Sequence, residues 1–161
     1  MAADLENTLY LEVPAGRVVI EMRPDLAPKH CAQIKELVRK GFYDGIPFHR
    51  VIEGFMVQTG CPRGNGTGGS GKHLKAEFSK EKHLRGVCSM ARAQDPNSAD
   101  SQFFIMLENT PSLDGQYSIW GKVTSGMEFV DAIKKGSPSR NGSVTDPDKI
   151  VSFKVAADVA A

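Results

Sequence analysis

Residues 48–60 read Phe-His-Arg-Val-Ile-Glu-Gly-Phe-Met-Val-Gln-Thr-Gly. Apolar residues dominate this stretch, yet it carries the polar side chains of Arg50 and Gln58. Residues 101–105 repeat the pattern, because the amide of Gln102 stands there among aromatic and aliphatic side chains. An apolar pocket with a few fixed polar groups is the usual build of a small-ligand or peptide site. The two stretches together therefore predict one such site.

Composition and charge are those of an ordinary globular protein. The 161 residues, 40% hydrophobic and 24% charged, predict a single domain with its own core. A formal net charge of +1 gives no electrostatic reason to expect nucleic acid. No apolar run approaches the roughly 20 residues that span a bilayer, so we expect no membrane segment. The acidic N-terminus lacks an apolar signal core, and we therefore do not expect secretion.

The three cysteines, Cys31, Cys61 and Cys88, form no close pair and leave one unmatched. This spacing favours buried thiols in a reducing cytoplasm over a disulfide framework. The sequence leaves open whether the thiols are sensitive to oxidation, because that depends on their exposure and local charge.

Alternating apolar and polar residues predict a β-hairpin near the N-terminus. Residues 9–13 and 17–22 alternate in this way, and Pro14-Ala15-Gly16 separates them. A helix is predicted over residues 27–40, because Pro28 suits a first turn and Gly41 a C-terminal stop. Four apolar residues fall on one face of this helix: Cys31, Ile34, Leu37 and Val38.

Short apolar runs between long polar loops predict six further strands. The runs cover residues 48–52, 55–59, 87–91, 103–107, 119–123 and 150–155. Ser125 and Glu128 are spaced as a capping box, and the apolar face behind them predicts a second, shorter helix ending before Gly136. Eight short strands and two helices are typical of an antiparallel barrel, although a sandwich has the same pattern.

A glycine-rich stretch, residues 64–72, matches two nucleotide-binding patterns, GxGxxG and GxxxxGK. The second pattern requires Ser or Thr after its lysine, and this chain has His73. No helical stripe follows at residues 73–78, and no βαβ pattern follows either. The stretch is better interpreted as a tight loop whose glycines allow other backbone to approach closely.

Other chemistries find little support in the sequence. The four histidines lack HxxxH or HExxH spacing, and the cysteines lack CxxC units, so we expect no metal and no cofactor. No GxSxG elbow indicates a serine hydrolase. Trp120 and Phe103 are interpreted as core residues, whereas Arg50 could either tie a loop or serve as a donor in a site.

The stretches 48–60 and 101–105 resemble the signature segments of the cyclophilins, the peptidyl-prolyl cis-trans isomerases. The likeness runs from about Leu9 to Val155. It implies a mainly β fold, a closed eight-stranded antiparallel barrel capped by two α-helices, and so decides against the sandwich. Residues 1–161 would form one such domain, with residues 1–7 as a loose tail.

The resemblance also implies roles for particular residues. Arg50 would be the catalytic residue, donating to the prolyl nitrogen of the substrate. Gln58 and Gln102 would bond the substrate backbone or hold Arg50, and Gly66 would let the peptide pass close by. The segment Ala91, Arg92, Ala93 would pair with the substrate as an added strand. The apolar cup for the proline ring would be formed by Phe55, Met56, Phe104 and Leu113.

Two positions depart from the pattern common in eukaryotic cyclophilins. Arg92 replaces an asparagine, and Tyr117 replaces a histidine beside the cup, where it could donate a hydrogen bond or form a wall. Both changes are familiar in bacterial members, so the chain resembles a bacterial cytoplasmic enzyme. Ser112 stands where drug-sensitive members usually have tryptophan, which predicts weak cyclosporin binding because serine lacks the indole surface.

Two functional hypotheses follow. The first is a monomeric, cofactor-independent isomerase that acts on proline-containing peptides and on unfolded or folding proteins. The second is a non-catalytic proline-peptide binding module or holdase chaperone that uses the same groove. The presence of Arg50 favours catalysis, because binding alone does not require a donor at the prolyl nitrogen.

Overall fold

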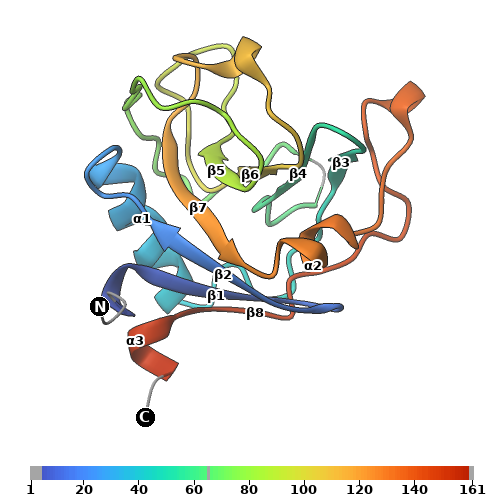
Figure 1. Ribbon diagram of the computed structural model, residues 1–161, viewed down its shortest axis with the longest axis horizontal. Helices are drawn as coiled ribbons and strands as arrows, with labels where there is room; N and C mark the ends of the chain where they lie inside the picture. Colours follow the sequence, from blue (N-terminus) through green and yellow to red (C-terminus); the bar gives the residue numbers. More distant parts are fainter. Residues whose placement is uncertain (1–4, 65, 160–161) are drawn as a thin grey trace.

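The computed structural model describes residues 5–64 and 66–159, and its main feature is one curled antiparallel sheet of eight strands (Figure 1). The strand order is β3-β4-β6-β5-β7-β2-β1-β8. The strands are β1 (Thr8–Val13), β2 (Gly16–Met22), β3 (Arg50–Ile52), β4 (Met56–Thr59), β5 (Val87–Met90), β6 (Phe103–Met106), β7 (Ile119–Ser125) and β8 (Ser152–Val155). Each of the predicted strands is present, most of them shorter than the apolar run that predicted it.

The predicted hairpin is confirmed as β1 and β2, which pair in register from Thr8 opposite Glu21 to Val13 opposite Gly16. Their alternate residues Leu9, Leu11, Val18 and Ile20 are fully buried. A strand presents successive side chains to opposite faces, so this alternation places one face of the hairpin on the core.

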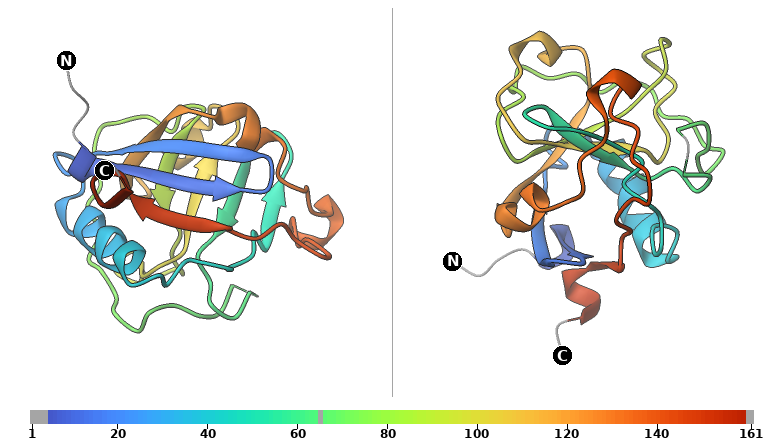
Figure 2. Two further views of the ribbon diagram at one scale, coloured as in Figure 1. Left: turned by 90° about the horizontal axis from the view of Figure 1, so that it is seen from below. Right: turned by 90° about the vertical axis from the view of Figure 1, so that its right-hand side faces the viewer.

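The sheet is open, and the expectation of a fully closed barrel is corrected. Its edge strands, β3 and β8, are not paired with each other in the described residues. The segments just before these strands pair instead, through a bridge between Pro47 and Lys149 and through backbone hydrogen bonds between residues 45–48 and 148–150. The sheet curls so that β1, β2 and β8 cross over the other strands, and the main core lies between the two halves (Figure 2).

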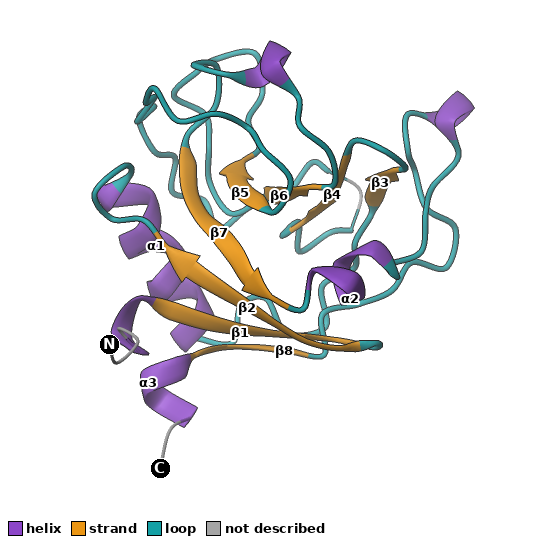
Figure 3. Ribbon diagram, in the orientation of Figure 1, coloured by secondary structure: helices purple, strands orange, loops and turns teal. Residues whose placement is uncertain are grey.

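The helix predicted at residues 27–40 is confirmed as α1 (Pro28–Arg39), with the four apolar residues of its predicted face buried. It packs against β7 and β8. A second helix, α2 (Met127–Asp131), packs against β2, and the two helices lie on opposite sides of the β2–β7 pair (Figure 3). A third, α3 (Ala156–Val159), was not predicted.

The predicted capping box before α2 is wrong. Ser125 is the last residue of β7, and Gly126, with a left-handed φ of 86°, precedes the helix without any side-chain cap. A side chain on Gly126 would collide with the backbone of Arg17, because a Cβ there would lie 2.3 Å from its carbonyl oxygen. Close approach to β2 therefore determines the start of α2, and local capping does not.

The predicted loose tail is corrected in part. Residues 1–4 lie outside the described residues, but Leu5–Asn7 form a 3₁₀ helix. Glu6 in this turn accepts a hydrogen bond from Arg39 of α1 at 2.8 Å, which ties the turn to the helix. Among the described residues, no helix combines the length and apolar character required to cross a bilayer.

Candidate functional site

The site lies on the outer face of β3, β4 and β6, because strand alternation separates it from the core. Val51, Val57 and Ile105 point inward to the main core, whereas Met56, Phe104 and Met106 form a second apolar cluster. Strand register places Arg50 opposite Gln58, and Gln58 opposite Phe104. A charged group, an amide and an aromatic ring therefore stand in one row across three strands.

Arg50 is held at one end of this row by two neighbours. Its Nη1 donates to Gln58 Oε1 at 3.0 Å. Its Nε and Nη2 donate to the backbone oxygen and to Oδ1 of Asn141, at 3.0 and 3.1 Å. Burial lowers the pKa of the Arg50 guanidinium, which still leaves it protonated at neutral pH. Its three bonds account for three of the five guanidinium N–H groups, so two have no partner among the described residues.

Asn141 was not predicted from the sequence. It adopts a left-handed φ of 57°, a conformation that asparagine tolerates better than most residues. The dipeptide Asn141-Gly142 is a turn signal and was the one available hint. That signal predicts a turn, but it does not predict that the turn lies against Arg50.

The two glutamines extend the row into the glycine-rich loop. Gln58 Nε2 donates to Gln102 Oε1 at 3.0 Å, and Gln102 Nε2 donates to the backbone oxygens of Gly66 and Gly68. The side chain of Gln102 therefore holds this loop and orients Gln58, which in turn orients Arg50. Of the two roles predicted for the glutamines, the structure shows contacts between Gln58 and Arg50, and binding to a substrate backbone stays a prediction.

The structure brings the residues predicted for the apolar cup together next to Arg50. They line a cavity of about 180 Å³. Its full lining is Arg50, Phe55, Met56, Gln58, Ala91, Arg92, Phe104, Leu113 and Tyr117. Met56 and Phe104 are almost fully buried and form its base. Tyr117 packs edge-on against Phe104 with ring centroids 5.5 Å apart and lines the cavity. Phe103 and Trp120, predicted as core, are both fully buried.

A second pocket, of about 290 Å³, adjoins the cup and shares Gln58, Ala91 and Arg92 with it. The remaining predicted site residues, Gly66, Ala93 and Gln102, line this second pocket. The two pockets together form a continuous groove, and every residue predicted for the site lines one or both of them. Asn65, which belongs to the glycine-rich stretch, lies outside the described residues.

Arg92 stands at the junction of the two pockets as a clamp. Its guanidinium donates to the backbone oxygens of Gln116, Ala93 and Gln94, at distances of 2.8 to 3.2 Å. It also lies over the ring of Tyr117, 4.7 Å from the centroid. The side chain therefore joins the loop that contains Ala93 and Gln94 to the loop that contains Gln116.

A buried histidine supports the cup from behind. His83 stacks on Phe104 with ring centroids 6.2 Å apart, and its two ring nitrogens contact Asp114 and Ser89. Burial lowers the pKa of His83, although the Asp114 carboxylate partly offsets this. The ring is therefore neutral at neutral pH, and it fixes the position of Phe104 without adding a charge.

The described residues offer no second functional site as well supported as this groove. A larger cavity of about 600 Å³ lies over the outer side of α1, but its basic side chains Lys35, Arg39 and Lys40 are each paired with carboxylates. No cluster of His, Cys, Asp or Glu in residues 5–64 and 66–159 could hold a metal ion. No helix begins between Lys72 and Val87, so the phosphate-loop interpretation of the glycine-rich stretch lacks its helix.

Comparison with known proteins identifies the family of the chain. The family model described as "Cyclophilin type peptidyl-prolyl cis-trans isomerase/CLD" matches residues 8–155. The chain is 57% identical to a "Probable peptidyl-prolyl cis-trans isomerase" of Brucella suis, over 98% of this chain and 86% of that protein. It is 43% identical to "Peptidyl-prolyl cis-trans isomerase B" of Bacillus subtilis, over 82% of this chain and 93% of that one.

Solved structures show the same fold. A cyclophilin of Hirschia baltica superposes with a TM-score of 0.88 at 29% identity, covering 99% of this chain and 77% of that one. A cyclophilin-type isomerase of Cryptosporidium parvum, crystallised in the presence of the dipeptide Ala-Pro, gives a TM-score of 0.83 at 29% identity, covering 92% of this chain and 98% of that one. The chain belongs to the cyclophilin-type peptidyl-prolyl cis-trans isomerase family.

Proposed function

We propose that Arg50 accelerates X–Pro rotation by stabilising the twisted transition state. Amide resonance gives rotation a barrier of about 18–20 kcal/mol. Twisting removes that resonance and localises a lone pair on the prolyl nitrogen, so a donor aimed at this nitrogen binds the twisted state better than either planar one. The observation that carries the proposal is a charged guanidinium fixed by Gln58 and Asn141 at the edge of an apolar cup.

The groove supports a specific placement of the substrate. The proline ring would enter the cup over Met56 and Phe104, and the residues before it would run along Ala91–Ala93 as an added strand. Such a site reads the ring and the peptide backbone, so many residues are acceptable before proline. The reaction requires only hydrogen bonding and burial, with no proton transfer, metal or cofactor.

The same proposal covers the cellular role. The protein would act as a monomer in the cytoplasm, on unfolded or folding proteins. Its three buried cysteines, none of them in a disulfide, support a reducing compartment. Cyclosporin would bind weakly, because the exposed Ser112 offers no indole surface near Leu113. A holdase that binds the same peptides without catalysis is the alternative, and it would not need the two N–H groups that Arg50 leaves for a ligand.

The test is NMR exchange between the cis and trans forms of a short X–Pro peptide, with wild type, Arg50→Lys and Arg50→Ala. We expect kcat/KM to fall by about 100-fold or more in Arg50→Ala, since one charged donor in a dry site supplies about 3–4 kcal/mol of transition-state stabilisation. Arg50→Lys would recover little, because a point charge cannot keep both neighbours and reach the nitrogen.

Circular dichroism and thermal unfolding would establish that each variant is folded. Peptide binding by the wild type without faster exchange would move the protein to the holdase class. Equal catalysis by all three proteins would show that Arg50 is not the source of the stabilisation.

A further inference from the structure

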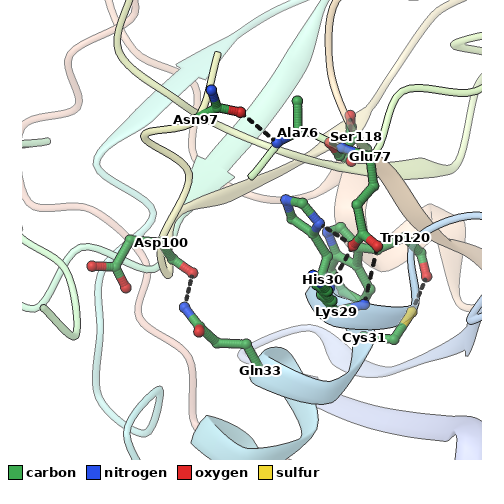
Figure 4. Close-up of polar contacts among 11 residues, drawn as sticks. Lys29, His30, Cys31, Gln33, Ala76, Glu77, Asn97, Asp100, Ser118 and Trp120 are labelled. Carbon is green, nitrogen blue, oxygen red and sulfur yellow. Dashed lines mark hydrogen bonds and ion pairs between the residues drawn. The ribbon is translucent and has the colours of Figure 1, made fainter. Parts of the chain in front are cut away.

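Helix α1 carries a buried amide that is not explained by packing of the helix. Gln33 is only 3% exposed, and its Nε2 donates to two backbone oxygens, that of Lys72 at 2.8 Å and that of Asp100 at 2.9 Å. Figure 4 shows the side chain reaching from α1 toward Asp100. Both donors of one amide therefore tie together two loops that are 28 positions apart in the sequence.

The two loops form one side of the second pocket. Gly66–Gly69 and His73 come from the first loop, and Ser98 and Asp100 come from the second. The Asp100 carboxylate joins the loops again on the pocket side, because it accepts hydrogen bonds from the backbone N–H groups of Ser70 and Gly71 and from the Ser70 hydroxyl. Gln33 therefore holds from the helix side the same two loops that Asp100 holds from the groove side.

The packing around this junction leaves little freedom. A Cβ on Gly69 would lie 2.6 Å from Asp100 Oδ2, so this loop is already in close contact with the Asp100 side chain. A backbone oxygen that loses its buried donor must find another, and the simplest route is for the loop to move toward water. Loss of the Gln33 donors would therefore displace Lys72 and Asp100, and the wall of the second pocket with them.

Gln102 joins Gln58 and Arg50 to the first loop through the backbone oxygens of Gly66 and Gly68, whereas Gln33 holds that loop at Lys72. Arg50 itself is fixed by Gln58 and Asn141, and none of residues 66–73 or 98–100 lines the cup. A change at Gln33 should therefore alter binding along the groove more than the chemistry at the prolyl nitrogen. Interactions that are equal in the ground and transition states change KM and leave kcat nearly constant.

We infer that Gln33 is a positioning residue that sets the second pocket for the substrate residues preceding X–Pro. The inference rests on the proposed function, because that function places those residues along Ala91–Ala93. It assigns to α1 a share in peptide affinity, although the helix itself does not line the groove.

The test compares two peptides on wild type and Gln33→Leu by NMR line-shape analysis, which yields KM and kcat. One peptide is acetylated directly before X–Pro, and the other carries three further residues before X. We expect the KM of the long peptide to rise about three- to tenfold in Gln33→Leu, with the KM of the short peptide and both kcat values within twofold of wild type. Gln33→Asn, which keeps the amide but shortens its reach, should give a smaller rise and serves if Gln33→Leu does not fold.

Leu37→Ala is the matched control, since Leu37 is buried on α1 in the main core and contacts neither pocket. It should lower the melting temperature without changing the ratio of the two KM values. An equal rise of KM for both peptides in Gln33→Leu, or no rise for either, would overturn the inference. Absence of catalysis by the wild type on both peptides would instead overturn the proposed function, and this inference with it.

Discussion

At the scale of single residues, catalysis is predicted to depend on Asn141 as well as Arg50. Asn141 supplies two of the three acceptors that fix the guanidinium, one from its backbone and one from its side chain. Arginine has a long and flexible stem, so the direction of its free N–H groups depends on the partners of the others.

Asn141→Gly separates these contributions, because glycine adopts the left-handed φ of 57° without strain and keeps the backbone acceptor. We expect kcat/KM to fall by about 5- to 20-fold, which corresponds to about 1–2 kcal/mol for one lost hydrogen bond to a charged group. Asn141→Ala should lose the same activity and, in addition, about 1 kcal/mol of stability through the left-handed backbone. Wild-type kinetics in Asn141→Gly would show that the backbone acceptor alone is sufficient.

The difference between Arg50 and Asn141 shows what could be predicted from the sequence at this scale. Arg50 and the residues of the cup lie within two short stretches of unusual composition, which the resemblance interprets directly. Asn141 lies 91 positions after Arg50, in a loop whose sequence indicates only a turn. A contact between distant loops has no local signature, and the same reason hides the partners of Gln33.

At the scale of elements, α1 depends on a carboxylate from outside the helix. Glu77 accepts hydrogen bonds from the backbone N–H groups of Lys29 and His30, which are among the unpaired donors of the first turn. Its Oε1 also lies 2.5 Å from Nδ1 of His30, a side chain without exposed surface (Figure 4). A negative charge at this end of a helix is stabilising.

The pKa values of this pair predict that acid weakens the protein. Burial lowers the pKa of His30, and the Glu77 carboxylate only partly offsets it. Burial alone would raise the pKa of Glu77, but the hydrogen bonds from His30 and Lys29 outweigh it and the net pKa is lowered. Both groups bind protons more readily in the unfolded chain, so stability is lost below pH 6.5 for His30 and below pH 4.5 for Glu77, their ordinary values.

His30→Gln tests this prediction, because glutamine can donate to Glu77 but does not titrate. The free energy of unfolding, from urea titrations at pH 7 and pH 5, should fall less with acid in His30→Gln than in wild type. Glu77→Gln should lose about 1 kcal/mol already at pH 7, through the missing charge at the helix terminus. An identical pH dependence in wild type and His30→Gln would contradict the assignment to His30.

Some of the elements could be predicted from their local sequence pattern. Period-two alternation and a helical stripe identify β1, β2 and α1, because each buries one face on a common core. In β6 all four residues are buried, two in each apolar cluster, so its pattern does not separate core from site. The start of α2 is determined by its contact with β2, and a capping pattern cannot indicate that.

At the scale of the whole molecule, whether the sheet closes depends on segments that are far apart in the sequence. The edge strands β3 and β8 are about 100 positions apart, and the bridge between Pro47 and Lys149, with the backbone hydrogen bonds beside it, joins the chain near them. Nothing in either segment distinguishes an open, curled sheet from a closed barrel. The family likeness indicates the strand number correctly, whereas the pairing at the edges required the structure.

The positions of the three cysteines allow the opening of one loop to be compared with the unfolding of the whole molecule. Cys31 and Cys88 lie in the main core, and burial raises the pKa of Cys31 to about 12 and that of Cys88 further. Cys61 is also buried, but it lies at the start of the glycine-rich loop, where its Sγ accepts the N–H of Gly68 at 3.2 Å. Between residues 66 and 86 the described backbone has one sheet bridge, Leu74 to Ala99, and hydrogen bonds to the side chains of Gln102 and Asp100 hold the glycine-rich part. Opening this loop therefore breaks fewer contacts than unfolding the main core.

We therefore expect two phases when the native protein reacts with a chromogenic disulfide such as DTNB at about pH 8. One equivalent, from Cys61, should react in the faster phase, because only the loop must open to expose it. Cys31 lines the cavity over α1 but is only 3% exposed, so it and Cys88 should react together at a rate that follows global unfolding of their common core. Cys61→Ser should remove the fast phase and leave the slow one unchanged. A single phase of three equivalents would show instead that the loop opens only when the whole sheet does.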